Sequence, residues 1–160
     1  MAGEFEQQWM LLALCIFFVV VEQLNRYPMK FKEAITGGRG SKNLRANLFI
    51  YRQATDVDGQ GSAVVLNQDG DIGKYNRANR SLTQFVEYAL PLISCLPINF
   101  YLWPVPTFIL VCVYFLGRLW HQVGYAQGGF GPHMMGFLIF TQAAYMLVGL
   151  MLIAYVKIVF

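Results

Sequence analysis

The sequence predicts an all-α membrane protein whose four spanning helices form an up-down bundle. Apolar residues make up 56% of the 160 residues and charged residues only 13%, and the mean hydropathy is +0.44. A soluble domain of this size could not bury so much apolar surface. Ten of the twelve Lys and Arg residues lie between Arg26 and Arg80. By the positive-inside rule, this concentration predicts one cytoplasmic loop rather than a nucleic-acid-binding surface.

Four apolar runs supply the helices of this bundle. We expect spans at about 5–25, 78–102, 105–125 and 134–157. The first run is interpreted as a retained span, because an acidic N-terminus without a small-residue cleavage site does not fit a signal peptide. The second contains Pro91 and Pro97, which a membrane helix tolerates, usually with a kink. Turns at 103–106 and 126–133 connect the last three spans.

The segment between the first two spans, residues 26–76, is expected to be a long cytoplasmic loop. It is polar, with glycine pairs and Asp-Gly turns at 58–59 and 69–70. Residues 56–67 have Asp and Gly at three calcium-loop positions, but Asn67 stands where a glutamate is needed. A turn-rich surface loop is therefore favoured, and no metal site is expected.

The whole chain, residues 1–160, is predicted to be a single integral membrane domain. Counting spans from the cytoplasmic loop places both termini on the far side and the 126–133 turn in the cytoplasm. The three cysteines, Cys15, Cys95 and Cys112, lie in different apolar runs without metal-ligand spacing. They are expected to be buried small hydrophobic residues.

Polar residues form a stripe on one face of the second span and another on the third. At about 100° per residue, the polar residues of the second span fall within an arc of about 80°, with a tyrosine at its edge. These residues are Arg77, Arg80, Gln84, Glu87 and Tyr88. The third span carries Arg118, His121 and Tyr125 on one face. Both stripes are expected at the cytoplasmic ends of their helices, so that they share one layer of the bundle.

Three of these charges, on Arg80, Glu87 and Arg118, are expected to avoid lipid, because a charge at the centre of a span costs about 2.5–3.5 kcal/mol. They would face inward, toward each other, toward a neighbouring subunit, or toward water and a ligand. An internal Arg–Glu pair that fixes helix register is the simplest interpretation. The arginines outnumber the glutamate, however, and surplus buried charge favours an anionic ligand. Arginine suits carboxylates and Glu87 suits an ammonium group. Glutathione, with two carboxylates, one amine and a thiol, fits this description.

The pattern resembles the membrane-associated proteins in eicosanoid and glutathione metabolism, which include microsomal glutathione transferases, leukotriene C synthase and membrane prostaglandin E synthase. The resemblance covers the four spans, the long first loop and both stripes. Its second-span signature reads Arg80, Gln84, Glu87 and then Tyr88, after an Arg77-Ala78 lead-in, and its third-span signature reads "GRLWHQVGY". The glutathione-contacting positions that it implies are Arg77, Arg80, Gln84, Glu87, Tyr88, Arg118, His121 and Tyr125.

The same resemblance implies that the protein is a homotrimer. It also implies a multi-pass protein of the endoplasmic reticulum, whose active site opens toward the cytosol. Glutathione would bind between neighbouring subunits, and a lipophilic substrate would enter from the membrane lipid. Gln84 replaces the family's usual asparagine, which lengthens the reach of the amide. The fourth span also lacks the arginine that family enzymes use to stabilise the thiolate. Its candidate replacements as catalytic groups are His133, Tyr125 and Arg26, and slow or pH-sensitive conjugation is expected.

The sequence thus predicts a glutathione transferase, possessing peroxidase activity on lipid hydroperoxides if the same thiolate attacks them. Isomerisation of a prostaglandin endoperoxide is a third chemistry on the same site. Two alternatives belong to other classes. A non-catalytic lipid-binding scaffold of the same fold is favoured by the missing arginine. A four-helix channel subunit would conduct ions and ignore glutathione.

Overall fold

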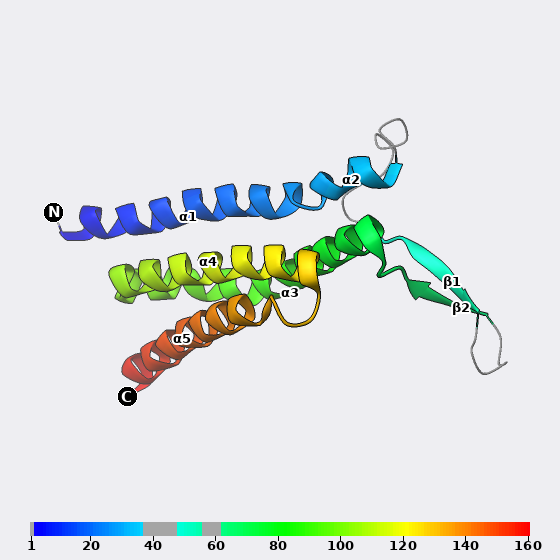
Figure 1. Cartoon of the computed structure of the whole chain (residues 1–160). Coiled ribbons are helices and arrows are strands. Elements are labelled where there is room, and N and C mark those ends of the chain that lie inside the picture. Colours follow the sequence, from blue (N-terminus) through cyan, green and yellow to red (C-terminus); the bar gives the residue numbers. More distant parts are fainter. Residues whose placement is uncertain (1, 37–47, 56–61) are drawn as a thin grey trace.

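A computed structural model of the chain describes residues 2–36, 48–55 and 62–160. Within these ranges the elements, in chain order (Figure 1), are α1 (Ala2–Arg26), α2 (Met29–Thr36), β1 (Tyr51–Thr55), β2 (Ser62–Leu66), α3 (Gly70–Leu102), α4 (Pro104–Gly128) and α5 (Met134–Val159). Four segments are long and apolar enough to cross a membrane: Gln7–Lys32, Gly70–Leu102, Pro104–Gly128 and Met134–Lys157. These segments correspond to the four predicted spans.

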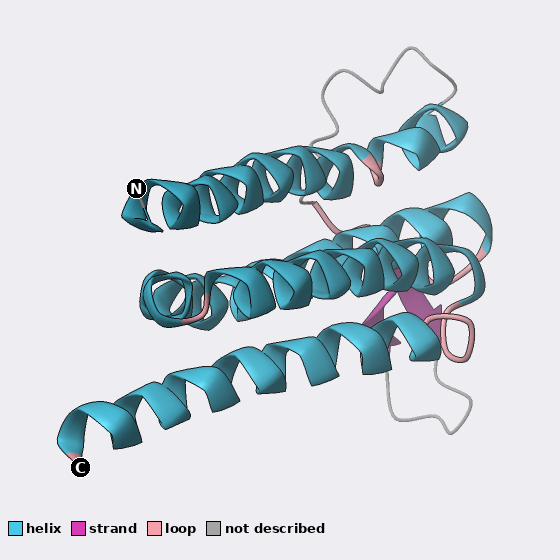
Figure 2. Cartoon of the chain, turned by 90° about the vertical axis from the view of Figure 1, so that its left-hand side faces the viewer, coloured by secondary structure: helices cyan, strands magenta, loops and turns pink. Residues whose placement is uncertain are grey.

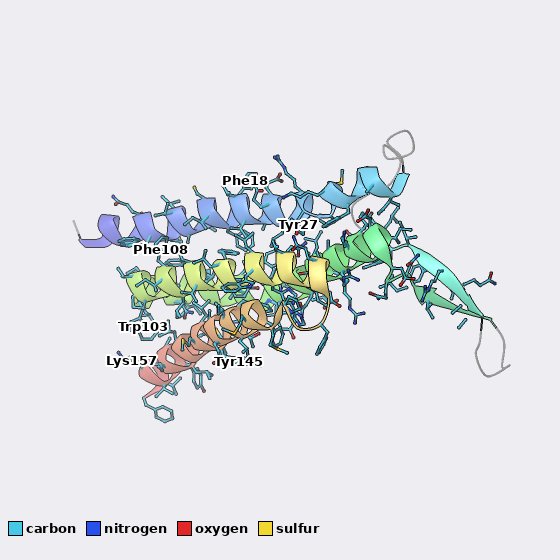
Figure 3. All side chains as sticks on the ribbon, in the orientation of Figure 1. Phe18, Tyr27, Trp103, Phe108, Tyr145 and Lys157 are labelled. Carbon is cyan, nitrogen blue, oxygen red and sulfur yellow. The ribbon has the colours of Figure 1, made fainter. Side chains whose placement is uncertain are left out.

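The helix α4 lies at the centre of the bundle and packs against α1, α3 and α5. Figure 1 shows α1 along one side of α4 and α5 along the other, and Figure 2 shows this order after a quarter turn. Both termini lie at the end where Trp103 joins α3 to α4 (Figure 3). The short helix α2, the two strands and the 129–133 turn lie at the opposite end. The up-down order of the helices is the one that the sequence predicted.

The segment 26–76 contains more regular structure than the predicted loop. The strands β1 and β2 form an antiparallel hairpin, a small two-stranded element that the sequence did not predict beside the all-α bundle. Val64 and Val65 of β2 suit an extended backbone because they are β-branched. The helix α3 begins at Gly70, earlier than the predicted position 78. The predicted turn at 58–59 lies outside the described residues.

Asparagine side chains attach the hairpin to the first turns of α3. Asn76 Oδ1 accepts a hydrogen bond from the Ile50 amide (2.9 Å), and Asn76 Nδ2 donates to the carbonyl oxygens of Ile50 and Asn67 (both 2.7 Å). Asn79 Nδ2 donates to the carbonyl oxygen of Leu48 (2.9 Å). Because Ile50 and Asn67 flank the paired strands, these bonds hold both ends of the hairpin on α3.

Glycines allow the backbones of α4 and α5 to approach closely. A Cβ on Gly117 would lie 2.6 Å from the amide nitrogen of Phe140. A Cβ on Gly136 would lie only 2.4 Å from the amide nitrogen of His121. Small residues at a membrane-helix interface permit this close packing, whereas any side chain would push the helices apart. The contact brings His121 against the start of α5.

The outer faces of the bundle are apolar. Phe18 of α1 and Tyr145 of α5, for example, are 68% and 67% exposed and point away from the other helices (Figure 3). Such side chains suit contact with lipid. The cysteines do not all behave as predicted, because Cys95 is buried, Cys112 is half-buried and Cys15 is exposed. Cys15 lies on the outer face of α1, so its apolar surroundings would be lipid and not protein.

Candidate functional site

A cavity of about 620 Å³ lies at the end of the bundle that carries the hairpin. It is bounded by one face of α3, the last turns of α4, the 129–133 turn and the start of α5. We call it the polar cavity, because charged groups, hydroxyls, an amide and imidazoles all line it alongside aromatic rings. A concave site with a few converging polar groups is typical of small-molecule binding.

Seven of the ten site residues predicted from the sequence line the polar cavity. They are Arg80, Gln84, Glu87, Tyr88, His121, Tyr125 and His133. The first four come from α3, the next two from α4 and the last from the turn before α5. The structure therefore brings together groups from both polar stripes, which are far apart in the sequence.

Arg80 and Glu87 lie at the rim of the cavity and not in the bundle interior. Both side chains are exposed, so within one chain they face the open cavity, one of the expected positions, and not the packed bundle interior. Among the described side chains, neither forms an ion pair. A cation and a carboxylate that face one cavity without pairing are both available to the ions of a ligand.

Arg118 is fully buried, as predicted, and lies behind the cavity wall. Its guanidinium donates to the carbonyl oxygen of Ser81 (2.7 Å) and, at 3.4 Å, to Gln84 Oε1. The guanidinium carbon lies 4.5 Å from the ring centre of Phe140 and 5.4 Å from that of Phe85. No carboxylate of the described residues lies within 4.0 Å of it. The bond to Oε1 leaves the Gln84 amide nitrogen for a ligand in the cavity.

The imidazole of His121 is held from several sides. Ser81 Oγ shares a 2.9 Å hydrogen bond with its Nδ1. The Tyr125 ring stacks on it, with 5.6 Å between ring centres and 14° between planes, and the His133 ring meets it edge-on at 5.2 Å. His133 Nδ1 donates to the carbonyl oxygen of Gly129 (2.9 Å), which orients that ring in turn. Because Ser81 occupies Nδ1 of His121, Nε2 is the nitrogen left for a ligand.

Arg77 and Arg26 lie outside the lining of the polar cavity, as Arg118 does. Arg77 donates to the carbonyl oxygens of Ala126 (3.2 Å) and Gln68 (3.0 Å), so it joins α3 to the end of α4. Arg26 forms an ion pair with Glu22 at 3.2 Å, and its side chain is 73% exposed. Within one chain, Arg77 and Arg26 are therefore not placed to touch a ligand in the polar cavity.

Six lining residues were not singled out from the sequence. They are Phe49, Ser81, Thr83, Phe130, Met134 and Phe137. Ser81 had a signal, because it lies four residues after Arg77 and three before Gln84, on the same helical face. Phe49 had none, because only the attachment of the hairpin to α3 brings it to the cavity.

A smaller cavity of about 170 Å³ adjoins the polar cavity and shares Tyr88 and Phe137 with it. Most of its remaining lining is apolar or aromatic and comes from α3, α4 and α5. A lipophilic molecule held there would lie next to the polar groups of the larger space.

Comparisons with protein-family models, with curated proteins and with solved structures find no match to this chain. Among the described residues, no group of three or more His, Cys, Asp or Glu side chains is arranged to hold a metal ion.

Proposed function

We propose that the chain is a membrane enzyme that binds glutathione and directs its thiolate at lipophilic electrophiles and hydroperoxides. One observation carries the proposal: Arg80 and Glu87 of α3 line a single cavity with His121 of α4. The cavity volume, about 620 Å³, lies within the range of about 300–1,000 Å³ typical of small-molecule sites.

The charges around the cavity suit an acidic ligand that also carries an ammonium group. Arg80 at the rim and Arg118 behind Gln84 supply two positive charges, and Glu87 supplies one negative charge. Glutathione has two carboxylates and one ammonium group, so its charges complement this set. Arg80 would hold a carboxylate, the Gln84 amide would donate to a carboxylate or peptide oxygen, and Glu87 would hold the ammonium.

His121 is the group best placed to act on the thiol. In the tautomer with a proton on Nδ1, the Ser81 oxygen accepts that proton's hydrogen bond, and Nε2 has a lone pair for the thiol proton. In the other tautomer Ser81 donates to Nδ1, and the Nε2–H donates to the thiolate. In either arrangement, His121 of α4 promotes the thiolate. In the family that the chain resembles, an arginine of the fourth span has this role, and this chain lacks that arginine. Tyr125 and His133 adjoin this ring and add a hydroxyl and a second imidazole.

The proposed reactions balance with glutathione as the only added reductant. In conjugation, the thiol proton leaves to His121 Nε2 or water, a sulfur–carbon bond forms, and the leaving group departs with its electron pair. With a hydroperoxide, the thiolate attacks the distal oxygen, the O–O bond breaks to give a sulfenic acid, and the alkoxide takes up the proton that the thiol gave up and leaves as an alcohol. A second glutathione then converts the sulfenic acid to a disulfide and water. The adjoining apolar cavity would hold the lipophilic partner in either case.

The family resemblance also implies how the protein assembles and where it is located. We expect a homotrimer in the endoplasmic reticulum, with the hairpin end of the bundle in the cytosol, where basic residues gather. Arg26 would touch glutathione only if a neighbouring subunit brought it to the polar cavity.

Calorimetric titration of glutathione into the detergent-purified full chain tests the binding step. We expect saturable binding that weakens about tenfold or more in Arg80→Gln, because a charge-assisted hydrogen bond is lost. Arg52→Gln is the matched control, since Arg52 is an exposed arginine of β1 that pairs with Asp69 outside the cavity. Absence of binding in the wild type would leave the scaffold and channel interpretations, and equal binding by Arg80→Gln would move the site elsewhere.

Turnover is tested separately by following thioether formation with a chlorinated dinitrobenzene. We expect a rate above that of the uncatalysed reaction. Saturable glutathione binding without such an increase would support a non-catalytic scaffold of the same fold.

A further inference from the structure

A separate cavity of about 310 Å³ lies between the α1–α2 junction and α4. Arg26, Tyr27 and Lys30 line it from the junction, and Gln122 lines it from α4. Figure 3 labels Tyr27 at this junction. None of the lining residues of this junction cavity also lines the polar cavity. The two spaces are therefore independent sites.

Two cations line the junction cavity, and the described protein neutralises only one of them. Arg26 pairs with Glu22 at 3.2 Å. Lys30 Nζ lies 5.0 Å from the ring centre of Tyr27, and no carboxylate of the described side chains lies within 4.0 Å of it. Among the described side chains, the charge of Lys30 is therefore without a counterion, and such a charge favours an anionic group in the cavity.

Gln122 supplies a second, independent feature that points to a ligand. Gln122 is only 1% exposed, and its Nε2 donates to the carbonyl oxygen of Ala78 (3.1 Å). Its Oε1 is buried and has no hydrogen-bond partner among the described residues. A buried acceptor without a donor is destabilising. A ligand that brings an O–H or N–H group into the cavity would satisfy this oxygen.

The junction cavity lies where the headgroups of a bilayer are expected. Arg26 and Lys30 occupy the last turns of the membrane-length segment Gln7–Lys32. Leu119 and Val123 of α4 add an apolar wall beside them. Basic residues at the end of a span contact lipid phosphates while acyl chains run along the apolar surface below. A membrane lipid therefore fits this place better than a soluble anion.

We infer that the junction cavity binds a glycerophospholipid headgroup, whose phosphate contacts Arg26 and Lys30 and whose adjacent O–H or N–H group donates to Gln122 Oε1. An anionic headgroup with hydroxyls, such as that of phosphatidylglycerol, matches both features. Phosphatidylethanolamine offers donors but no net charge, and phosphatidylcholine offers neither. Such a lipid would tie α1 and α2 to α4 whether or not glutathione is bound.

Native mass spectrometry of the full chain in detergent, without glutathione, tests this site against the three lipids. We expect the affinity to fall in the order phosphatidylglycerol, phosphatidylethanolamine, phosphatidylcholine. The double variant R26Q/K30Q should bind phosphatidylglycerol about 30-fold more weakly, because two contacts between cation and phosphate are lost. The double variant R52Q/K74Q removes the same charge from the same end of the protein outside the cavity, and should bind like the wild type.

Gln122→Met should abolish the preference for phosphatidylethanolamine over phosphatidylcholine. If this variant does not fold, the order of the three lipids on the wild type still tests the acceptor. Equal binding of the three lipids, or unchanged phosphatidylglycerol binding by R26Q/K30Q, overturns the inference. Displacement of phosphatidylglycerol by an equal concentration of glycerol 3-phosphate overturns the lipid assignment and identifies a soluble phosphate ligand.

Discussion

Ser81 Oγ and His121 Nδ1 lie 2.9 Å apart, in a hydrogen bond that joins α3 to α4 at the base of the polar cavity. Both side chains are buried, at 1% and 4% exposure. The bond orients the imidazole and determines which of its nitrogens a ligand can meet. In the proposed reaction this pair takes the place of the arginine that the fourth span does not have.

Ser81→Ala should lower the rate of glutathione conjugation more than the affinity for glutathione. Without the hydroxyl, the imidazole is no longer held in one orientation, and we expect kcat to fall by about 10- to 100-fold. Steady-state kinetics with varied glutathione measures this. Thr83→Ala is the control, because Thr83 also lines the cavity but donates to its own helix at Asn79. An equal loss in both variants would contradict a specific role for Ser81.

Arg118→Met should bind glutathione about tenfold more weakly without lowering the thermal midpoint of the protein in detergent. A buried cation with no described carboxylate partner is expensive to desolvate, so an apolar replacement of similar length is neutral or stabilising. Glutathione affinity should fall because the Gln84 amide loses its orienting donor. Titration calorimetry and a thermal melt read the two effects independently. A clear drop in the melting midpoint would show that the arginine stabilises the bundle.

Gly136→Ala should destabilise the protein by about 1–3 kcal/mol, because the added Cβ would lie 2.4 Å from the His121 amide nitrogen and force α4 and α5 apart. Gly149→Ala is the matched control on the same helix, since a Cβ there meets nothing within 4 Å. It should be neutral or slightly stabilising. Denaturant unfolding in detergent distinguishes the two, and equal stabilities would show that the two helices move apart at no cost.

Asn76→Ala should release the hairpin from α3 while leaving the bundle folded. The substitution removes the hydrogen bonds to Ile50 and Asn67, at a local cost of about 1–3 kcal/mol. Limited proteolysis should cut the 48–66 region faster than in the wild type, with little change in helical content. Lys74→Ala, which breaks only an exposed ion pair with Asp71, should change the cleavage rate little. Equal protection of all three proteins would refute the anchoring role.

The sequence by itself determined the four membrane-length helices, their up-down order and the helical faces that carry polar residues. Helix length and hydropathy decide the number of spans and their up-down order, because a span needs about twenty apolar residues. The helical repeat decides which residues share a face, so the grouping of Arg80, Gln84 and Glu87 could be predicted from spacing alone.

Tertiary structure decided which members of each stripe share a cavity. The repeat places residues on a face, but the rotation of each helix against its neighbours sets whether that face meets another helix or open space. Close contacts at Gly117 and Gly136 set this rotation for α4 and α5. As a result, Arg118 is enclosed behind the wall of the polar cavity, whereas His121 forms part of that wall. The spacing of these two residues, which places them on one helical face, could not predict this difference.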